Sequence, residues 1–214
     1  MTTIENLLDV ELEKRDETWE REFLKSLPAL RVKVLSAEPR PGPDHWPYLL
    51  LTTEEADDDA GNILNWLSTR GIGMVLNPQK PHPDYVLSYG MIWNFRERGE
   101  FVSAGAGGDK PASDRFEITP GQELLVGPPS EGYLPKYVRS TIRQFFADQG
   151  VLAPKVLMIS QDKLNFDLCF SIESLKSPPA HEHANIAEAL SWFLPAHYTV
   201  ALVSEKTVAG FQPL

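Results

Sequence analysis

The sequence predicts an α/β (α+β) fold made of two similar α-β-β-α-β units. The main observation is a repeat with an offset of 122 positions (21 to 143). It pairs Arg21-Glu22-Phe23 and Lys33-Val34-Leu35 with Arg143-Gln144-Phe145 and Lys155-Val156-Leu157. A later pair of tryptophans, Trp66 and Trp192, matches at an offset of 126. Segments with strand character also alternate with segments of helical spacing, which favours a layered fold of helices and strands.

The first unit is expected at residues 1–78 and begins with helix. Apolar residues from Ile4 to Leu27 recur at helical spacing, so 4–27 forms one long amphipathic helix or two short ones, and Pro28 ends it. Strands are predicted at 31–37, 48–53 and 73–76, with a helix at 56–70. We expect Trp66 and its counterpart Trp192 to be buried in cores, or between two units packed as a pseudo-symmetric pair.

Residues 79–133 have no counterpart in the repeat and are predicted to form a β-rich insert. The strongest strand there is 85–95, because large apolar residues occupy alternate positions from Tyr85 to Phe95 and therefore share one face. A hairpin turn leads to a short strand near Phe101, and a Gly-rich loop follows at 104–111. Further strands are expected at 115–119 and 123–126.

The second unit is expected at 134–214. Pro135 suits a helix start, the apolar residues from Val138 to Phe146 mark one helix face, and Gly150 ends the helix. Strands are predicted at 155–160, 167–173 and 198–203, and a helix passes through Leu190. The order of elements is the same as in the first unit.

Composition and charge restrict the function classes. The chain has 214 residues and a formal net charge of −10, which repels phosphates and anionic lipids, so neither nucleic acid nor a membrane is an expected partner. A basic protein or peptide would suit this surface, as would plain solubility. The single cysteine, Cys169, cannot form an internal disulfide and suits a cytoplasmic protein. The first residues lack the basic region and apolar core of a signal peptide.

Three motifs are candidates for chemistry. The Gly-rich loop lacks the G-x-x-x-x-G-K-[ST] pattern, because Lys110 is followed by Pro111, so a hairpin loop is favoured over a nucleotide site. His181 and His183 stand two residues apart, which is not the H-E-x-x-H spacing of a helical zinc site. The acidic run at 54–59 lacks EF-hand spacing and suits a helix start. No metal or cofactor is therefore expected.

The aromatic strand and the adjacent loop are the predicted binding site. Large aromatic residues supply contact area at protein interfaces, although a half-buried sheet face has the same pattern and the core alternative is favoured. The predicted partner-binding residues are Tyr85, Tyr89, Trp93, Phe95, Gly105, Gly107 and Gly108.

Several short motifs resemble the SseB family (enhanced serine sensitivity protein). They are Gly73-Met74-Val75-Leu76-Asn77-Pro78, Lys155-Val156-Leu157-Met158, Leu168-Cys169-Phe170-Ser171-Ile172, Leu194-Pro195 and Gly210-Phe211-Gln212-Pro213. The Gly-rich loop and the long acidic N-terminal helix depart from that family's pattern. The resemblance implies a bacterial cytosolic protein and no established catalytic residues.

The sequence does not contain an assembled catalytic motif. We therefore expect a non-catalytic protein-binding or adaptor module, for example of the immunity-protein or secretion-chaperone type. The alternative is a hydrolase or metal-dependent enzyme that uses scattered carboxylates together with His181 and His183.

Overall fold

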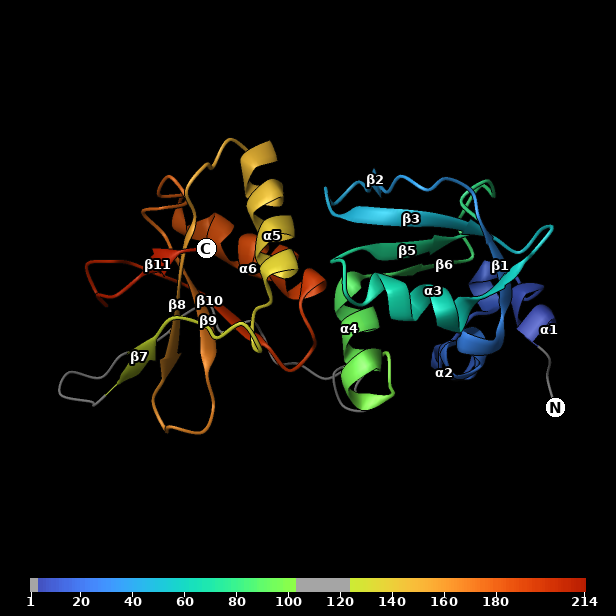
Figure 1. Ribbon diagram of the computed structural model, residues 1–214, viewed down its shortest axis with the longest axis horizontal. Coiled ribbons are helices and arrows are strands. Elements are labelled where there is room, and N and C mark those ends of the chain that lie inside the picture. Colours follow the sequence, from blue (N-terminus) through green and yellow to red (C-terminus); the bar gives the residue numbers. More distant parts are fainter. Residues whose placement is uncertain (1–3, 103–123) are drawn as a thin grey trace. The chain divides into compact units, whose positions relative to one another are not determined.

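The computed structural model describes residues 4–102 and 124–214. The chain divides into two compact units, Met1–Val102 and Ser103–Leu214, and each unit has its own mixed sheet with helices packed on it (Figure 1). The predicted α/β class is therefore confirmed.

The first unit contains a six-stranded sheet with the order β4-β1-β3-β5-β6, and β2 pairs with β3. The strands are β1 (Arg31–Val34), β2 (Arg40–Pro41), β3 (Pro47–Thr52), β4 (Asp58–Asp59), β5 (Gly73–Leu76) and β6 (Tyr85–Leu87). The β1–β3 pair is antiparallel and the β3–β5 pair is parallel. β6 then closes the outer edge of β5 in the antiparallel direction.

Four helices and two 3₁₀ turns complete the first unit. They are α1 (Ile4–Leu8), η1 (Leu12–Lys14), α2 (Glu17–Ser26), η2 (Leu27–Ala29), α3 (Ala60–Leu67) and α4 (Tyr89–Arg98). Asp16 caps α2 by accepting a hydrogen bond from the Trp19 backbone N–H, and Ser88 caps α4 in the same way. Gly99 ends α4 in the left-handed conformation, with φ of 75°.

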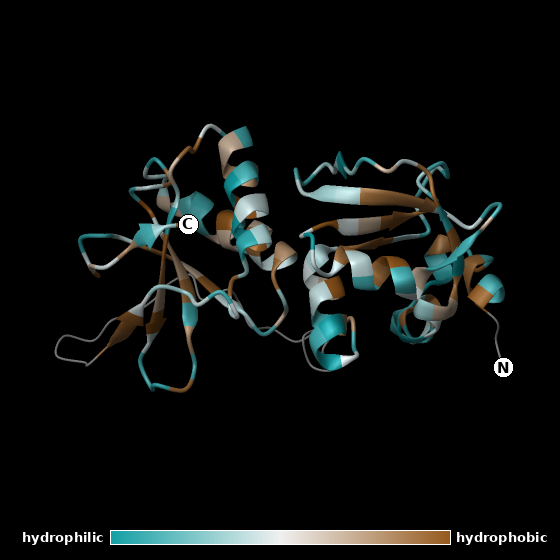
Figure 2. Ribbon diagram, in the orientation of Figure 1, coloured by the Kyte–Doolittle hydropathy of each residue, from teal (hydrophilic) through white to brown (hydrophobic). Residues whose placement is uncertain are grey.

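The core of the first unit lies between the helices and one face of the sheet. Leu51, Met74 and Leu76 from the central strands are fully buried against Phe23 and Leu64 from the helices. Figure 2 shows the hydrophobic residues running along β3 and β5. Alternate residues of each strand point to this face, as expected for a β-strand, in which successive side chains point to opposite faces.

The second unit contains a five-stranded sheet with the order β10-β9-β8-β11, and β7 pairs with β8. Its elements are β7 (Leu125–Gly127), α5 (Lys136–Asp148), β8 (Lys155–Ser160), β9 (Asp167–Ser171), η3 (Ala180–Glu182), α6 (His183–Phe193), β10 (Thr199–Val203) and β11 (Gln212–Pro213). The β8–β9 pair is antiparallel and the β9–β10 pair is parallel.

Apolar residues pack against both faces of the second sheet. Phe170 packs towards Phe146 of α5, with 5.7 Å between ring centroids. Residues of the opposite face, including Leu157, Cys169 and Ala201, form a separate small cluster with Val208. Burial on both faces explains why β8 and β9 are almost continuously apolar.

The two units share an α-β-β-α-β order and the pairings among those three strands, whereas their other strands differ. In each, a helix precedes two antiparallel strands, and a second helix leads to a third strand parallel to the second. A common origin of the two halves stays a prediction.

Three predictions about the first half and the middle region were wrong. The 85–95 segment is a strand only as far as Leu87 and then becomes α4, because Ser88 caps a helix in which Tyr89, Ile92 and Trp93 share a buried face. No strand forms at 101–102. The separate insert at 79–133 is instead divided, since β6 and α4 join the first unit and β7 joins the second. The 115–119 segment lies outside the described residues.

The predicted burial of the two matching tryptophans in the cores of their own units was also wrong. Trp66 is 43% exposed and Trp192 is 48% exposed. The buried residues of α3 include Leu64 and Leu67, and those of α6 include Leu190 and Phe193. Each tryptophan falls between two such positions along the helix, and at 3.6 residues per turn it therefore points away from the apolar stripe.

Candidate functional site

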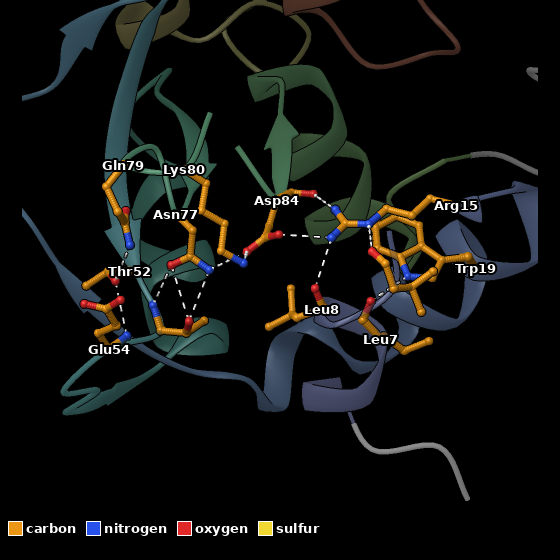
Figure 3. A network of polar contacts seen from close by, with 12 residues as sticks. Leu7, Leu8, Arg15, Trp19, Thr52, Glu54, Asn77, Gln79, Lys80 and Asp84 are labelled. Carbon is orange, nitrogen blue, oxygen red and sulfur yellow. Dashed lines mark hydrogen bonds and ion pairs between the residues drawn. The ribbon is translucent and has the colours of Figure 1, made fainter. Parts of the chain in front are cut away.

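The first unit contains a buried carboxylate, Asp84, surrounded by donors (Figure 3). Asp84 precedes β6 and is 5% exposed. Its Oδ1 accepts a hydrogen bond from Arg15 Nη2 at 3.0 Å. Its Oδ2 accepts from Lys80 Nζ and from Asn77 Nδ2, each at 2.6 Å. Burial acts to raise the pKa of Asp84, but the hydrogen bonds from Lys80, Asn77 and Arg15 outweigh it and lower the pKa.

Arg15 links this carboxylate to the N-terminal segment. Its Nε donates to the Val10 carbonyl oxygen at 3.0 Å, and its Nη2 donates to the Leu8 carbonyl oxygen at 3.1 Å. Its Nη1 donates to the Asp84 backbone oxygen at 2.7 Å. The guanidinium also lies 4.6 Å from the Trp19 ring centroid. One side chain therefore fastens α1 and the start of α2 to the β5–β6 connection.

Asn77 forms the other side of the network. It follows β5 with φ of 53°, a left-handed conformation that asparagine tolerates better than most residues. Its Oδ1 accepts from the Thr53 backbone N–H at 2.9 Å. Asn77 thereby connects the ends of the parallel strands β3 and β5 to Asp84.

The second unit has a polar cluster at the matching edge of its sheet, where the parallel strands β9 and β10 end. Glu205 accepts from Lys155 Nζ at 3.0 Å and from Ser171 Oγ at 2.6 Å. Glu173 accepts from Ser204 Oγ at 2.5 Å and from the Glu205 backbone N–H at 2.8 Å. These contacts lower the pKa values of both Glu173 and Glu205.

The carboxyl ends of parallel strands are the usual ligand-binding edge of an open α/β sheet. Here the named carboxylates at both edges already accept hydrogen bonds from side chains or backbone of the same unit. We therefore interpret these two clusters as cross-links that join strand ends and loops.

The histidines and acidic residues singled out from the sequence do not converge. His181 lies 3.8 Å from Glu182, and His183 Nε2 contacts the Pro178 carbonyl oxygen at 2.9 Å. In the acidic run, Glu55 pairs with Lys33 and Asp59 pairs with Arg31, while Asp58 accepts from Asn62. Within residues 4–102 and 124–214, no group of three His, Cys, Asp or Glu side chains could hold a metal ion.

The predicted aromatic site lies largely in the core of the first unit. Tyr89 and Trp93 are each 2% exposed, which agrees with the core alternative for these residues. Tyr85 is half-buried against Phe23, and its hydroxyl donates to Glu20 Oε1 at 2.5 Å. Phe95 stacks on Phe101 with 4.2 Å between centroids. Gly105, Gly107 and Gly108 lie outside the described residues.

The exposed tryptophans are the residues that sequence reasoning missed. Trp66 on α3 and Trp192 on α6 are each the second-last residue of their helix, and they are 43% and 48% exposed. The guanidinium of Arg70 lies 4.3 Å from the Trp66 ring centroid. Helical periodicity alone could have found them, because both fall outside the apolar stripe of their helices.

Comparisons with known proteins found no matching family model, no matching curated protein and no matching solved structure. The resemblance to the SseB family therefore stays a prediction. Among the helices described, none is both long and apolar enough to cross a membrane.

Proposed function

We propose that this chain is a non-catalytic protein-binding module of the cytosol, with Trp66 and Trp192 as contact residues. The observation that supports the proposal is their partial exposure at the second-last position of a helix in each unit. Tryptophan is among the residues most enriched at the energetic centres of protein interfaces.

The surroundings of Trp66 suit an interface. Arg70 stacks against its indole ring, and arginine is the other residue type that is common at such centres. The net charge of −10 favours a partner with a basic surface, because opposite charge accelerates association and discriminates against acidic partners.

The test compares the wild type with Trp66→Ala and Trp192→Ala. Partners are captured by crosslinking in a lysate of the source organism, identified, purified and titrated. A hot-spot tryptophan is worth about 2 kcal/mol or more, so each substitution should weaken binding of a true partner by about thirtyfold. Thermal melts should remain close to wild type, because neither residue belongs to a core.

Leu152→Ala and Leu164→Ala are the matched controls, since each removes an exposed apolar side chain elsewhere. They should leave partner binding unchanged. The proposal is wrong if no captured protein binds the purified chain. The assignment of the tryptophans is wrong if a bound partner is insensitive to both Trp substitutions.

A further inference from the structure

The first sheet carries an exposed apolar row on the face opposite its helices. Val86 on β6 lies opposite Val75 on β5, and Val75 lies opposite Leu50 on β3. Leu35 directly follows β1 and donates its backbone N–H to the Leu50 carbonyl oxygen at 2.9 Å, which continues the row. We call these four residues the outer row. Leu35 is 49% exposed and Val86 is 38% exposed, while Leu50 and Val75 are partly exposed.

The outer row points away from the core, because successive side chains of a strand point to opposite faces. The neighbouring residues Leu51 and Leu76 point to the helices and belong to the core cluster, which contains none of the four outer-row residues. On the outer face, Tyr48 and Thr52 flank Leu50 along β3, and both are 4% exposed. The exposed apolar surface is therefore a single row that crosses the strands.

The second unit has an equivalent row, which is buried. At the offsets of 122 and 126, Leu35 and Val75 correspond to Leu157 and Ala201. Cys169 on the middle strand lies opposite both of them. All three residues of this second row are at most 4% exposed. The two units are therefore apolar at the same place and differ in what covers it.

The C-terminal segment covers the row of the second unit. β10 and β11 lie at opposite ends of the strand order β10-β9-β8-β11, so the chain between them passes from one edge of the sheet to the other. Val208 and Phe211 of this segment pack with the row. A Cβ built on Gly210 would lie 3.6 Å from Leu157 Cδ1. In the first unit, the chain that leaves β5 forms the adjacent strand β6 and has no need to cross the sheet.

We propose that the outer row binds an extended, uncharged segment of another protein, which crosses the strands as residues 208–211 cross the second sheet. That internal cover defines the chemistry of the segment. It has an aliphatic residue, two small residues and an aromatic residue in the order Val-Ala-Gly-Phe. The inference rests on the proposed protein-binding function and gives it a second surface, separate from the tryptophans.

The charges around the outer row favour an uncharged segment. The charged residues two positions from the row, and so on the same face, are Lys33 and Asp84. Lys33 pairs with Glu55 at 2.9 Å, and Asp84 pairs with Arg15 and Lys80 at 3.0 and 2.6 Å. Because these charges are already compensated within the unit, binding depends on burial of apolar surface.

The probe is a synthetic peptide with the sequence of residues 207–213, capped at both ends so that it carries no charge and labelled for fluorescence anisotropy. The control peptide carries serine in place of its valine and its phenylalanine and keeps the same length and charge. With the full chain, the first peptide should bind saturably. The serine peptide should bind at least about tenfold more weakly, because it lacks both large apolar side chains.

The protein variants place a charge on the outer row. Leu35→Lys and Val86→Lys change exposed positions and should each weaken peptide binding at least about tenfold, with circular dichroism confirming that they fold. Val86→Thr keeps the branched shape and should also weaken binding, so the test survives if a lysine variant misfolds. Leu152→Lys is the control, because Leu152 is 84% exposed in the second unit, and it should leave binding unchanged. Trp66→Ala and Trp192→Ala should also leave peptide binding unchanged, so failure of the outer row and failure of the tryptophan surface are separable.

NMR of the leucine and valine methyl groups in the full chain gives the residue-level result. The peptide should shift the methyl signals of the outer row saturably and leave those of Leu152 in place. Absence of these shifts, or equal binding of the serine peptide, overturns the proposal. Shifts at Leu157 in their place would show that the peptide displaces the C-terminal segment, and would also overturn it. A dimer in sedimentation experiments that Val86→Lys dissociates would assign the outer row to a second copy and overturn the proposed partner.

Discussion

Replacing Asp84 with asparagine should destabilise the first unit strongly. The substitution keeps the side-chain shape but removes the charge that faces Arg15 and Lys80. It also turns an acceptor into an amide donor that faces the donors of Lys80 and Asn77. Arg15 then remains buried, with its side chain 9% exposed and without its carboxylate.

The magnitude follows from burial. Loss of one partner from a buried ion pair costs about 3–5 kcal/mol, because the remaining charge is desolvated and uncompensated. Lys80 is 46% exposed and can turn to solvent, so we expect the lower end, about 3 kcal/mol. With a urea m-value of about 1–3 kcal/mol/M, the midpoint falls by roughly 1–3 M.

Urea unfolding followed by tryptophan fluorescence measures this change, because four of the five tryptophans lie in the first unit. Glu55→Gln is the control, since it removes the same type of contact with Lys33 at the surface and should leave the midpoint unchanged. Combining Asp84→Asn with Arg15→Met should cost less than the sum of the two single changes. Equal midpoints for Asp84→Asn and Glu55→Gln would refute the reasoning.

The same pair of proteins gives a pH prediction. The pKa of Asp84 in the folded state lies below that in the unfolded chain, which is about 3.9. Its contribution to stability is therefore fully present above the unfolded pKa and is lost as the pH falls through the folded pKa. The stability difference between wild type and Asp84→Asn should be constant near neutral pH and shrink below about pH 4. A difference that grows on acidification contradicts this.

Three further predictions concern other sites. Gly73→Ala places a Cβ 2.6 Å from the Tyr48 ring and 2.7 Å from the Leu87 backbone oxygen, and it should lower the free energy of unfolding by about 1–3 kcal/mol in urea titrations; unchanged stability contradicts this clash. Burial and the nearby charge of Asp167 raise the pKa of the Cys169 thiol, so a thiol reagent should react slowly with native protein and rapidly in denaturant; rapid native reaction contradicts the burial. Hydrogen bonds from Asn165 and Leu164 lower the pKa of Asp162 to about 2, so these bonds should weaken only as the pH falls towards 2; an NMR titration midpoint near 3.9 contradicts this.

Local sequence patterns predicted the elements correctly where an apolar run ended at a clear turn-forming or polar residue. The predicted bounds of β5 and β8 match the structure, because apolar runs there end at polar or turn-forming residues. The prediction of a strand over 85–95 failed because the spacing of the large residues fits both the two-residue repeat of a strand and the 3.6-residue repeat of a helix. Only the capping bond at Ser88 and the closing Gly99 decide for the helix, and neither is visible in an alternation count.

The candidate sites were harder to predict than the fold. One of the donors to Asp84, Arg15, lies 69 positions away, and no spacing rule connects residues so distant. The exposure of the two tryptophans could have been predicted by assigning each residue of α3 and α6 to a face of its helix. Their apolar character alone favoured a core position.

The bond between Arg15 and Asp84 also sets an order of events during synthesis. At about 5–20 residues per second, the ribosome needs roughly 3–14 s to add the 69 positions that separate them. During that interval the acidic N-terminal segment has no carboxylate at position 84 to hold its arginine. Arg15 can therefore make this bond only after β5 and the turn at Asn77 have been synthesised, so the contact between the N-terminal helices of the unit and Asp84 forms late relative to the helices themselves.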